Sequence, residues 1–182
     1  PFAGWFARQG WAPRPHQLAV LAAAQAGRDV LLVAPTGGGK TLAGFLPSLT
    51  ELAATSPAGL HTLYVSPLKA LAADVARNLI RPVCELSLNI TIATRSGDTT
   101  ATERRKQREN PPNILLTTPE SLAVLLSQSG ISTLLAPVRR IVIDEIHALA
   151  GSKRGDQLAL CLARLNTISP NATRIGLSAT VA

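Results

Sequence analysis

The chain has 182 residues, of which 46% are hydrophobic, and this predicts one globular domain with a substantial core and excludes a disordered chain. The formal net charge of +7 favours a polyanionic partner such as nucleic acid, although basicity alone is weak evidence. Neither a secretory signal nor an apolar run long enough to cross a bilayer is present. We therefore expect a soluble, cytoplasmic protein with no membrane partner.

The apolar pattern predicts alternating strands and helices. After an aromatic, irregular segment at residues 1–15, a helix is expected over residues 16–26. Apolar runs typical of strands follow at residues 30–34, 62–66, 89–94, 114–117, 141–144 and 173–178. Helical patterns lie between most of them, at residues 39–55, 68–79, 101–109, 120–127 and 156–168. This alternation predicts an α/β fold, a mostly parallel sheet with helices on both faces. Functional residues are then expected just after the strands.

A phosphate-binding loop is predicted after the first strand. Residues 30–34 are typical of a buried strand, and a loop with the sequence Thr36, Gly37, Gly38, Gly39 leads to Lys40 and Thr41 at the start of a helix. Glycines let backbone N–H groups close around phosphate oxygens, and the Lys40 side chain reaches the outer phosphates. The Thr41 hydroxyl is expected to bind Mg²⁺. Ala34 stands where the general P-loop pattern has glycine, so an ordinary glycine-rich turn is the alternative.

A second informative stretch is the apolar run that ends in Asp144 and Glu145. A strand that ends in a carboxylate is typical of a Walker B site, in which Asp144 holds Mg²⁺ opposite Thr41. Glu145 is placed to orient and deprotonate the attacking water. Strands that end in acidic residues are common, so this prediction depends on the phosphate-binding loop upstream.

The motifs APTGGGKT (34–41), DEIH (144–147) and SAT (178–180), in this order, resemble the first RecA-like domain of superfamily 2 DExH-box helicases. That superfamily tolerates alanine at the position of Ala34. WFARQGWAPRPHQ (5–17), SPLKAL (66–71), TRSGDT (94–99), LLTTPESL (115–122) and KRGDQLAL (153–160) are similar to the large helicase-related (Lhr) group. Within that group the chain most resembles the ligase-associated DNA helicases. The resemblance implies a RecA-like P-loop NTPase domain over residues 1–182, with a Q-motif-like segment at residues 1–27, and ATP and Mg²⁺ as cofactors.

The resemblance also implies roles for individual residues. Gln17 matches the glutamine that reads the adenine edge, with Trp11 as a neighbouring support for the base, and His147 is expected to contact neighbouring motifs. Ser178 and Thr180 match the motif that couples nucleotide state to nucleic-acid binding. The expected contacts with the sugar-phosphate backbone are Pro67, Leu68, Lys69, Gly97, Asp98, Thr118, Pro119 and Glu120.

Two of these stretches also have plainer interpretations. Thr118 and Pro119 have the residue types that begin a helix, as the N-cap and the first helical position, and both roles can hold at once. The basic cluster at residues 104–108 is more often a solvated helix face than a ligand site.

We therefore expect the N-terminal motor domain of an ATP-dependent DNA helicase, acting in DNA repair. The second RecA-like domain with its arginine fingers lies outside this sequence, so the chain alone is expected to bind ATP weakly and to hydrolyse it negligibly. The alternatives are an RNA or RNA–DNA helicase, a translocase on duplex, and a nucleotide- or nucleic-acid-binding module without turnover. A DNA ligase or nuclease partner is implied by the subgroup resemblance only.

Overall fold

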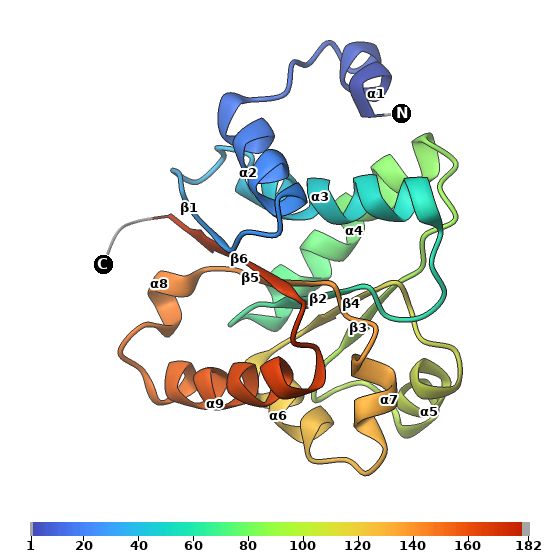
Figure 1. Ribbon diagram of the computed structural model, residues 1–182, viewed down its shortest axis with the longest axis vertical. Coiled ribbons are helices and arrows are strands. Elements are labelled where there is room, and N and C mark those ends of the chain that lie inside the picture. Colours follow the sequence, from blue (N-terminus) through green and yellow to red (C-terminus); the bar gives the residue numbers. More distant parts are fainter. Residues whose placement is uncertain (1, 180–182) are drawn as a thin grey trace.

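A parallel sheet organises the chain (Figure 1). A computed structural model describes residues 2–179, and within them six strands form one sheet in the order β1-β6-β5-β2-β4-β3, every neighbouring pair parallel. The strands are β1 (Val30–Val33), β2 (Thr62–Val65), β3 (Ile92–Arg95), β4 (Ile114–Thr117), β5 (Arg140–Ile143) and β6 (Thr173–Ser178). The predicted α/β fold is confirmed.

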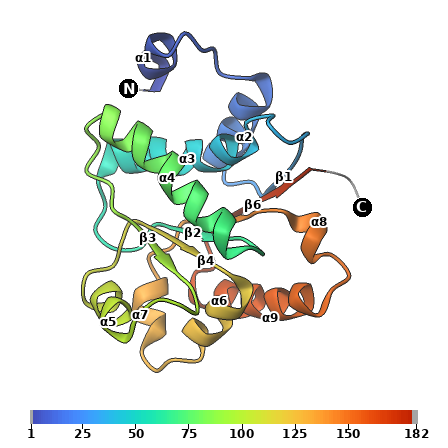
Figure 2. The same cartoon turned by 180° about the vertical axis from the view of Figure 1, so that it is seen from behind.

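Helices cover both faces of the sheet, as Figures 1 and 2 show from opposite sides. One face carries α1 (Phe2–Arg8), α2 (Pro15–Gln25), α3 (Lys40–Thr55) and α4 (Lys69–Glu85). The other carries α5 (Ala101–Glu109), α6 (Pro119–Leu126), α7 (Ile131–Leu135), α8 (Ile146–Leu149) and α9 (Lys153–Ile168). The chain moves across the sheet from β1 to β3 with helices on the first face, and returns through β4, β5 and β6 with helices on the second. Right-handed crossovers require this change of face.

The core therefore has two layers, one on each side of the sheet. Successive residues of a strand point to opposite faces. On β2, Tyr64 packs in the layer under α3 and α4, whereas Leu63 and Val65 pack in the layer with α6, α7 and α9. No helix of the described residues is long and apolar enough to span a membrane.

Strand β1 is buried on one face only, contrary to the expected buried strand. Leu32 packs in the layer with α2 and α3, but Leu31 and Val33, which alternate with it, are 64% and 40% exposed. One face of β1 is exposed because, among the described residues, β1 is the edge strand of the sheet and pairs only with β6.

Two helices depart from the pattern predicted for them. Residues 2–8, expected to be irregular, form α1, because Phe2, Trp5 and Phe6 share one buried face at helical spacing. Helix α4 continues to Glu85 and passes through Pro82, whereas the sequence pattern suggested an end at residue 79. Val83, which follows the proline, is buried in the same core layer as Phe2, Trp5 and Phe6. This tertiary packing outweighs the helix hydrogen bond that Pro82 cannot donate.

Two other boundaries are set by side chains. Helix α9 begins earlier than predicted because the Ser152 hydroxyl accepts a hydrogen bond from Gly155 N at 3.1 Å and caps its first turn. Strand β3 begins at Ile92, later than predicted. The preceding N–H, of Thr91, donates to Asn113 Oδ1 at 2.9 Å and so bonds to a side chain.

Candidate nucleotide and nucleic-acid site

The predicted site residues gather at the carboxyl edge of the sheet, in two halves. The phosphate-binding loop follows β1, the SAT motif begins at the end of β6, and the acidic pair follows β5; these three strands are neighbours. The segments expected to contact nucleic acid follow β2, β4 and β3, which are the other three neighbours. We call these the nucleotide half and the nucleic-acid half.

The loop between β1 and α3 has the geometry of a phosphate cradle. Gly37 and Gly39 both have φ of +77°, in the left-handed region that favours glycine. A side chain at Gly38 would place its Cβ 2.7 Å from the Pro35 carbonyl oxygen, so only glycine fits there. Buried Lys40 donates from Nζ to the same Pro35 oxygen at 3.2 Å, so its ammonium lies across the loop.

The acidic pair is held in two different ways. Asp144 is buried, and its Oδ2 accepts a hydrogen bond of 2.5 Å from the Tyr64 hydroxyl while its Oδ1 accepts one of 2.8 Å from Glu145 N. Burial and the adjacent Asp144 charge raise the pKa of Tyr64, which keeps the phenol protonated as a donor. Glu145 is partly exposed and has a left-handed backbone, with φ of 50°.

The loop and the acidic pair face the same part of the edge. Only β6 lies between β1 and β5, so the two strand axes are about 10 Å apart by the usual spacing of neighbouring strands. Ala34 N, at the start of the loop, donates to Ser178 O at 3.1 Å, so the loop is attached to the end of β6. The geometry fits a nucleotide: backbone N–H groups for phosphates on one side, and a buried carboxylate for a cation on the other.

The residues present also fit the predicted Mg²⁺. No group of three or more His, Cys, Asp or Glu side chains suited to a metal occurs in residues 2–179. Mg²⁺ in nucleotide sites keeps several waters and uses one or two protein oxygens besides the phosphates. The Asp144 carboxylate and the Thr41 hydroxyl are hard oxygen ligands of this kind.

His147 connects the acidic pair to the end of β6. Its Nδ1 lies 3.1 Å from Ser178 Oγ and accepts from Ala179 N at 3.4 Å, and its Nε2 lies 3.3 Å from Glu145 Oε2. Nε2 is therefore the ring nitrogen that faces the Glu145 carboxylate. His147 thus contacts neighbouring motifs, as the resemblance implied. Thr180, the other predicted coupling residue, lies outside the described residues.

A cavity of about 350 Å³ adjoins the loop and is lined by Phe6, Trp11, Ala12, Arg14, Gln17, Gly39 and Leu42. Gln17 is buried; its Nε2 donates to Gly39 O at 3.3 Å, and its Oε1 accepts from Arg14 N at 2.9 Å. A flat apolar wall and a polar edge next to the phosphate cradle suit a nucleotide base.

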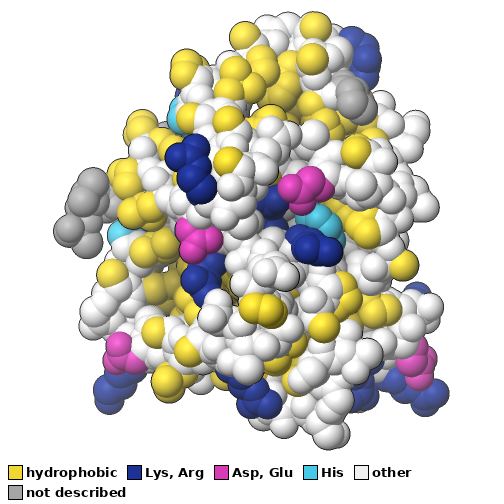
Figure 3. Space-filling view, in the orientation of Figure 1, with side chains coloured by type: hydrophobic (Ala, Val, Ile, Leu, Met, Phe, Trp, Pro, Cys, Tyr) yellow, Lys and Arg dark blue, Asp and Glu magenta, His cyan; other side chains and the backbone are white. Residues whose placement is uncertain are grey.

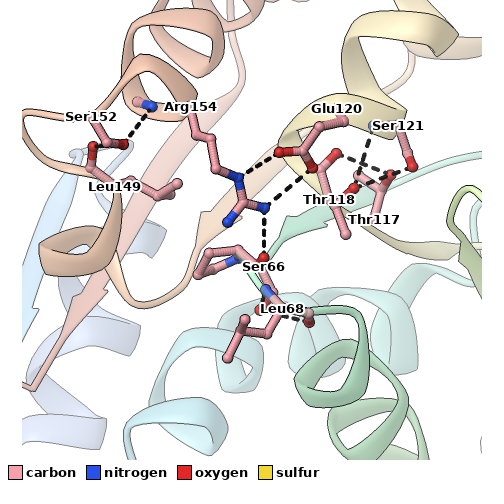
Figure 4. Close-up of polar contacts among 11 residues, drawn as sticks. Ser66, Leu68, Thr117, Thr118, Glu120, Ser121, Leu149, Ser152 and Arg154 are labelled. Atoms are coloured by element: carbon pink, nitrogen blue, oxygen red, sulfur yellow. Dashed lines mark hydrogen bonds and ion pairs between the residues drawn. The ribbon is translucent and has the colours of Figure 1, made fainter.

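In the nucleic-acid half, the three predicted segments follow neighbouring strands. Arg154 of α9 joins the segments after β2 and β4 (Figure 4). Arg154 Nη2 donates to Pro67 O at 2.6 Å, and Nε donates to Glu120 Oε1 at 2.5 Å. Thr118 Oγ1 accepts from Ser121 N at 3.3 Å, so its predicted N-cap role is observed. Lys69 Nζ pairs with Asp98 at 3.0 Å across the solvent-exposed side.

Two residues of this edge were not identified from the sequence. Tyr64 lies inside an apolar run, and its contact with Asp144 arises only because β2 and β5 are neighbours. Arg154 belongs to the KRGDQLAL stretch that carried part of the family resemblance, and its position beside Glu120 of α6 was the missing information.

Known helicases resemble this chain in sequence and in structure. The model of the DEAD/DEAH box helicase family matches residues 14–182. The Lhr helicase/probable uracil glycosylase of Mycolicibacterium smegmatis is 46% identical over 191 residues, 97% of this chain and 13% of that protein. The ATP-dependent helicase Lhr-Core of Methanocaldococcus jannaschii is 41% identical over 196 residues, 100% of this chain and 23% of that protein.

Solved structures of helicases also match this chain. The structure of Mycobacterium smegmatis helicase Lhr bound to ssDNA and AMP-PNP matches with a TM-score of 0.86 at 46% identity, covering 99% of this chain and 24% of that one. The DUF1998 helicase MrfA bound to DNA and AMPPNP matches with a TM-score of 0.87 at 31% identity, covering 97% and 25%. The chain spans about an eighth to a quarter of the lengths of these proteins. The resemblance to the Lhr group is confirmed, and the narrower ligase-associated assignment stays a prediction.

Proposed function

This chain belongs to the DEAD/DEAH box helicase family as a helicase motor domain, and we propose that ATP hydrolysis in its nucleotide half drives movement along single-stranded DNA held by its nucleic-acid half. One contact carries the proposal. The Tyr64 hydroxyl of β2 donates to Asp144 after β5, and so joins the two halves where β2 and β5 pair. A change at the acidic pair therefore acts directly on a strand that ends in a nucleic-acid segment.

Within the nucleotide half we assign roles by chemistry. Backbone N–H groups of residues 37–41 and the Lys40 ammonium bind the phosphates, and the base occupies the cavity beside Gln17 and Trp11. Mg²⁺, held by Thr41 and Asp144, supplies charge neutralisation for phosphoryl transfer. Glu145 accepts a proton from the attacking water, and His147 keeps the Glu145 carboxylate oriented.

Within the nucleic-acid half, the contacts we propose are to the sugar-phosphate backbone. Small residues, backbone N–H groups and the N-terminus of α6 bind phosphates without reading sequence. The proposed contacts are Pro67, Leu68, Lys69, Gly97, Asp98, Thr118, Pro119 and Glu120. The relatives solved with DNA, at 46% and 31% identity, support DNA over RNA, and RNA or an RNA–DNA hybrid is the second candidate.

Several expectations about the whole protein remain proposals of the same kind. A second RecA-like domain completes the ATP site, residues 1–27 form the Q-motif-like segment, and Ser178 with Thr180 couples the two halves. We also keep three predictions that no contact in the structure addresses. A role in DNA repair and a ligase or nuclease partner follow from the family resemblance. A cytoplasmic location follows from the sequence, in which neither a secretory signal nor a membrane-spanning run was found.

The test compares the natural full-length protein with its Glu145→Gln variant. We expect the variant to bind radiolabelled ATP with unchanged affinity and to lose DNA-stimulated phosphate release by about a hundredfold or more, since a general base typically supplies that much. A wild-type protein that binds ATP but releases no phosphate with DNA would favour the binding-module alternative. Undiminished hydrolysis by the variant would reject the role of Glu145.

A further inference from the structure

A buried arginine without an acidic partner lies at the end of β3. The Arg95 side chain is 2% exposed, and its Nη2 donates to the neutral Gln128 Oε1 at 3.3 Å. Its Nη1 has no hydrogen-bond partner, and no ion pair to Arg95 occurs, among the residues that the structure describes. Burial and two nearby cations, Arg104 and Arg108, lower the pKa of Arg95.

Arg95 borders a cavity of about 160 Å³ between the β3–α5 loop and α6. Arg104 shares this cavity; its Nη2 donates to Ser96 O at 3.2 Å and Gly97 O at 3.1 Å, and its Nε is buried without a partner within the described chain. Ser121, in the first turn of α6, lies on the other side. The cavity opens at the nucleic-acid half, because its walls follow β3 and β4.

The charges around this cavity do not balance. Glu120 also lines it, but Arg154 engages both of its carboxylate oxygens, at 2.5 and 3.2 Å. Within residues 2–179, Arg95 and Arg104 are left with no acidic partner. Buried charges are otherwise paired, because an unpaired charge in a protein interior is costly. An anion from outside the chain would relieve this cost.

We propose that Arg95 and Arg104 form a pocket for one backbone phosphate of the bound single strand. The inference rests on the proposed function and adds two residues to its nucleic-acid half. A phosphate in the cavity brings a negative charge beside the two guanidinium side chains that line it, and two guanidinium groups suit a phosphate better than any neutral ligand. The volume is sufficient for one phosphate group.

The test measures the salt dependence of DNA binding by the natural full-length protein. Fluorescence anisotropy with a labelled oligo-dT strand is recorded over a range of NaCl for the wild type, Arg95→Met and Arg104→Gln. Losing one phosphate contact should lower the slope of log K against log salt by about 0.7, which corresponds to roughly fivefold weaker binding at about 0.1 M salt relative to 1 M.

The matched control is Arg105→Gln, one residue along the same helix, which removes the same charge. Arg105 pairs with Glu109 at 2.6 Å and is 74% exposed, so its slope should stay close to the wild-type value. A second measurement is the melting temperature without DNA, which Arg95→Met should leave unchanged or raise, because an unpaired buried charge is removed.

The outcomes separate this inference from the proposed function. Wild-type slopes in both Arg95→Met and Arg104→Gln, or an equal change in Arg105→Gln, would overturn the phosphate pocket alone. A melting temperature several degrees lower in Arg95→Met would show that the buried charge serves the fold and would also overturn it. A wild-type protein that does not bind the strand would overturn the proposed function, and this inference with it.

Discussion

At the scale of single residues, Tyr64 shows how a neutral group can serve a charged site. It is the only tyrosine of the chain, and its ring stacks on Phe45 with centroids 5.1 Å apart. This packing fixes the hydroxyl 2.5 Å from Asp144 Oδ2, while the raised pKa of Tyr64 keeps the proton on the phenol. The carboxylate is thereby held in one orientation, with Oδ1 bound to Glu145 N.

Tyr64→Phe should therefore weaken both the fold and the proposed Mg²⁺ site. The substitution keeps the ring and leaves Asp144 Oδ2 without its donor, which costs roughly 1–3 kcal/mol for a buried polar group. We expect a lower melting temperature and a higher Mg²⁺ concentration for half-maximal ATPase activity in the natural full-length protein. The hydrogen bond would be unimportant if Tyr64→Phe had the wild-type melting temperature and Mg²⁺ dependence.

At the scale of elements, α1 forms part of the wall of the proposed base cavity. The indole of Trp5 donates to Glu85 Oε2 on α4 at 2.6 Å, and its ring contacts Trp11 edge to face with centroids 5.8 Å apart. Gln9 donates to the same Glu85 oxygen at 2.9 Å. Helix α4 thus fixes α1, and α1 supports Trp11 at the cavity.

Trp11→Ala should raise the KM for ATP by about tenfold and leave kcat nearly unchanged, because stacking on a base contributes roughly 1–3 kcal/mol to binding and not to the chemical step. Trp11 is 52% exposed, so the melting temperature should change little. Steady-state ATPase measurements check the split between KM and kcat. An unchanged KM would remove the base from this cavity.

A different set of contacts joins elements at the opposite edge of the sheet. Glu51 of α3 pairs with Arg140 of β5 at 2.5 Å and with His61 beside β2 at 3.1 Å. These residues line a cavity of about 690 Å³, and Figure 3 shows acidic, histidine and basic side chains gathered in a hollow on this face. Three helices, α2, α3 and α9, end around this cavity.

This cluster should make stability depend on pH. Burial lowers the pKa of His61 below 6.5 more strongly than Glu51 raises it, and Arg140 lowers it further. Below about pH 6.5 the unfolded chain therefore binds a proton that the folded chain does not, and stability falls until the folded pKa is reached. The melting temperature should fall more steeply between about pH 7 and about pH 5 in the wild type than in His61→Gln. Equal slopes would contradict the assignment.

At the scale of the whole molecule, periodicity and the strand–loop–helix pattern predicted the parallel sheet and the residues at its carboxyl edge. Contacts between distant elements were not predictable in the same way. Helix α1 forms because its aromatic face meets the core, β1 is half-exposed because of its place at the sheet edge, and Arg154 reaches Pro67 only in the folded chain. These contacts depend on the order of the strands in the sheet, and no local sequence pattern predicts that order.

The strand order also separates the two proposed binding functions along the carboxyl edge of the sheet. The residues proposed to bind nucleotide follow β1, β6 and β5, those proposed to bind nucleic acid follow β2, β4 and β3, and the β5–β2 pair joins the two sets. A motor requires both halves, because ATP hydrolysis moves nothing unless the protein also binds the nucleic acid.

Strand separation by the natural full-length protein tests this account most directly. The substrate is a DNA duplex with a single-stranded tail, and release of the labelled strand is followed with ATP, with AMP-PNP, and in Glu145→Gln with ATP. We predict release only for the wild type with ATP, and retained binding to the tail in all three cases. Equal release with AMP-PNP or in Glu145→Gln would contradict a motor driven by hydrolysis at this sheet edge.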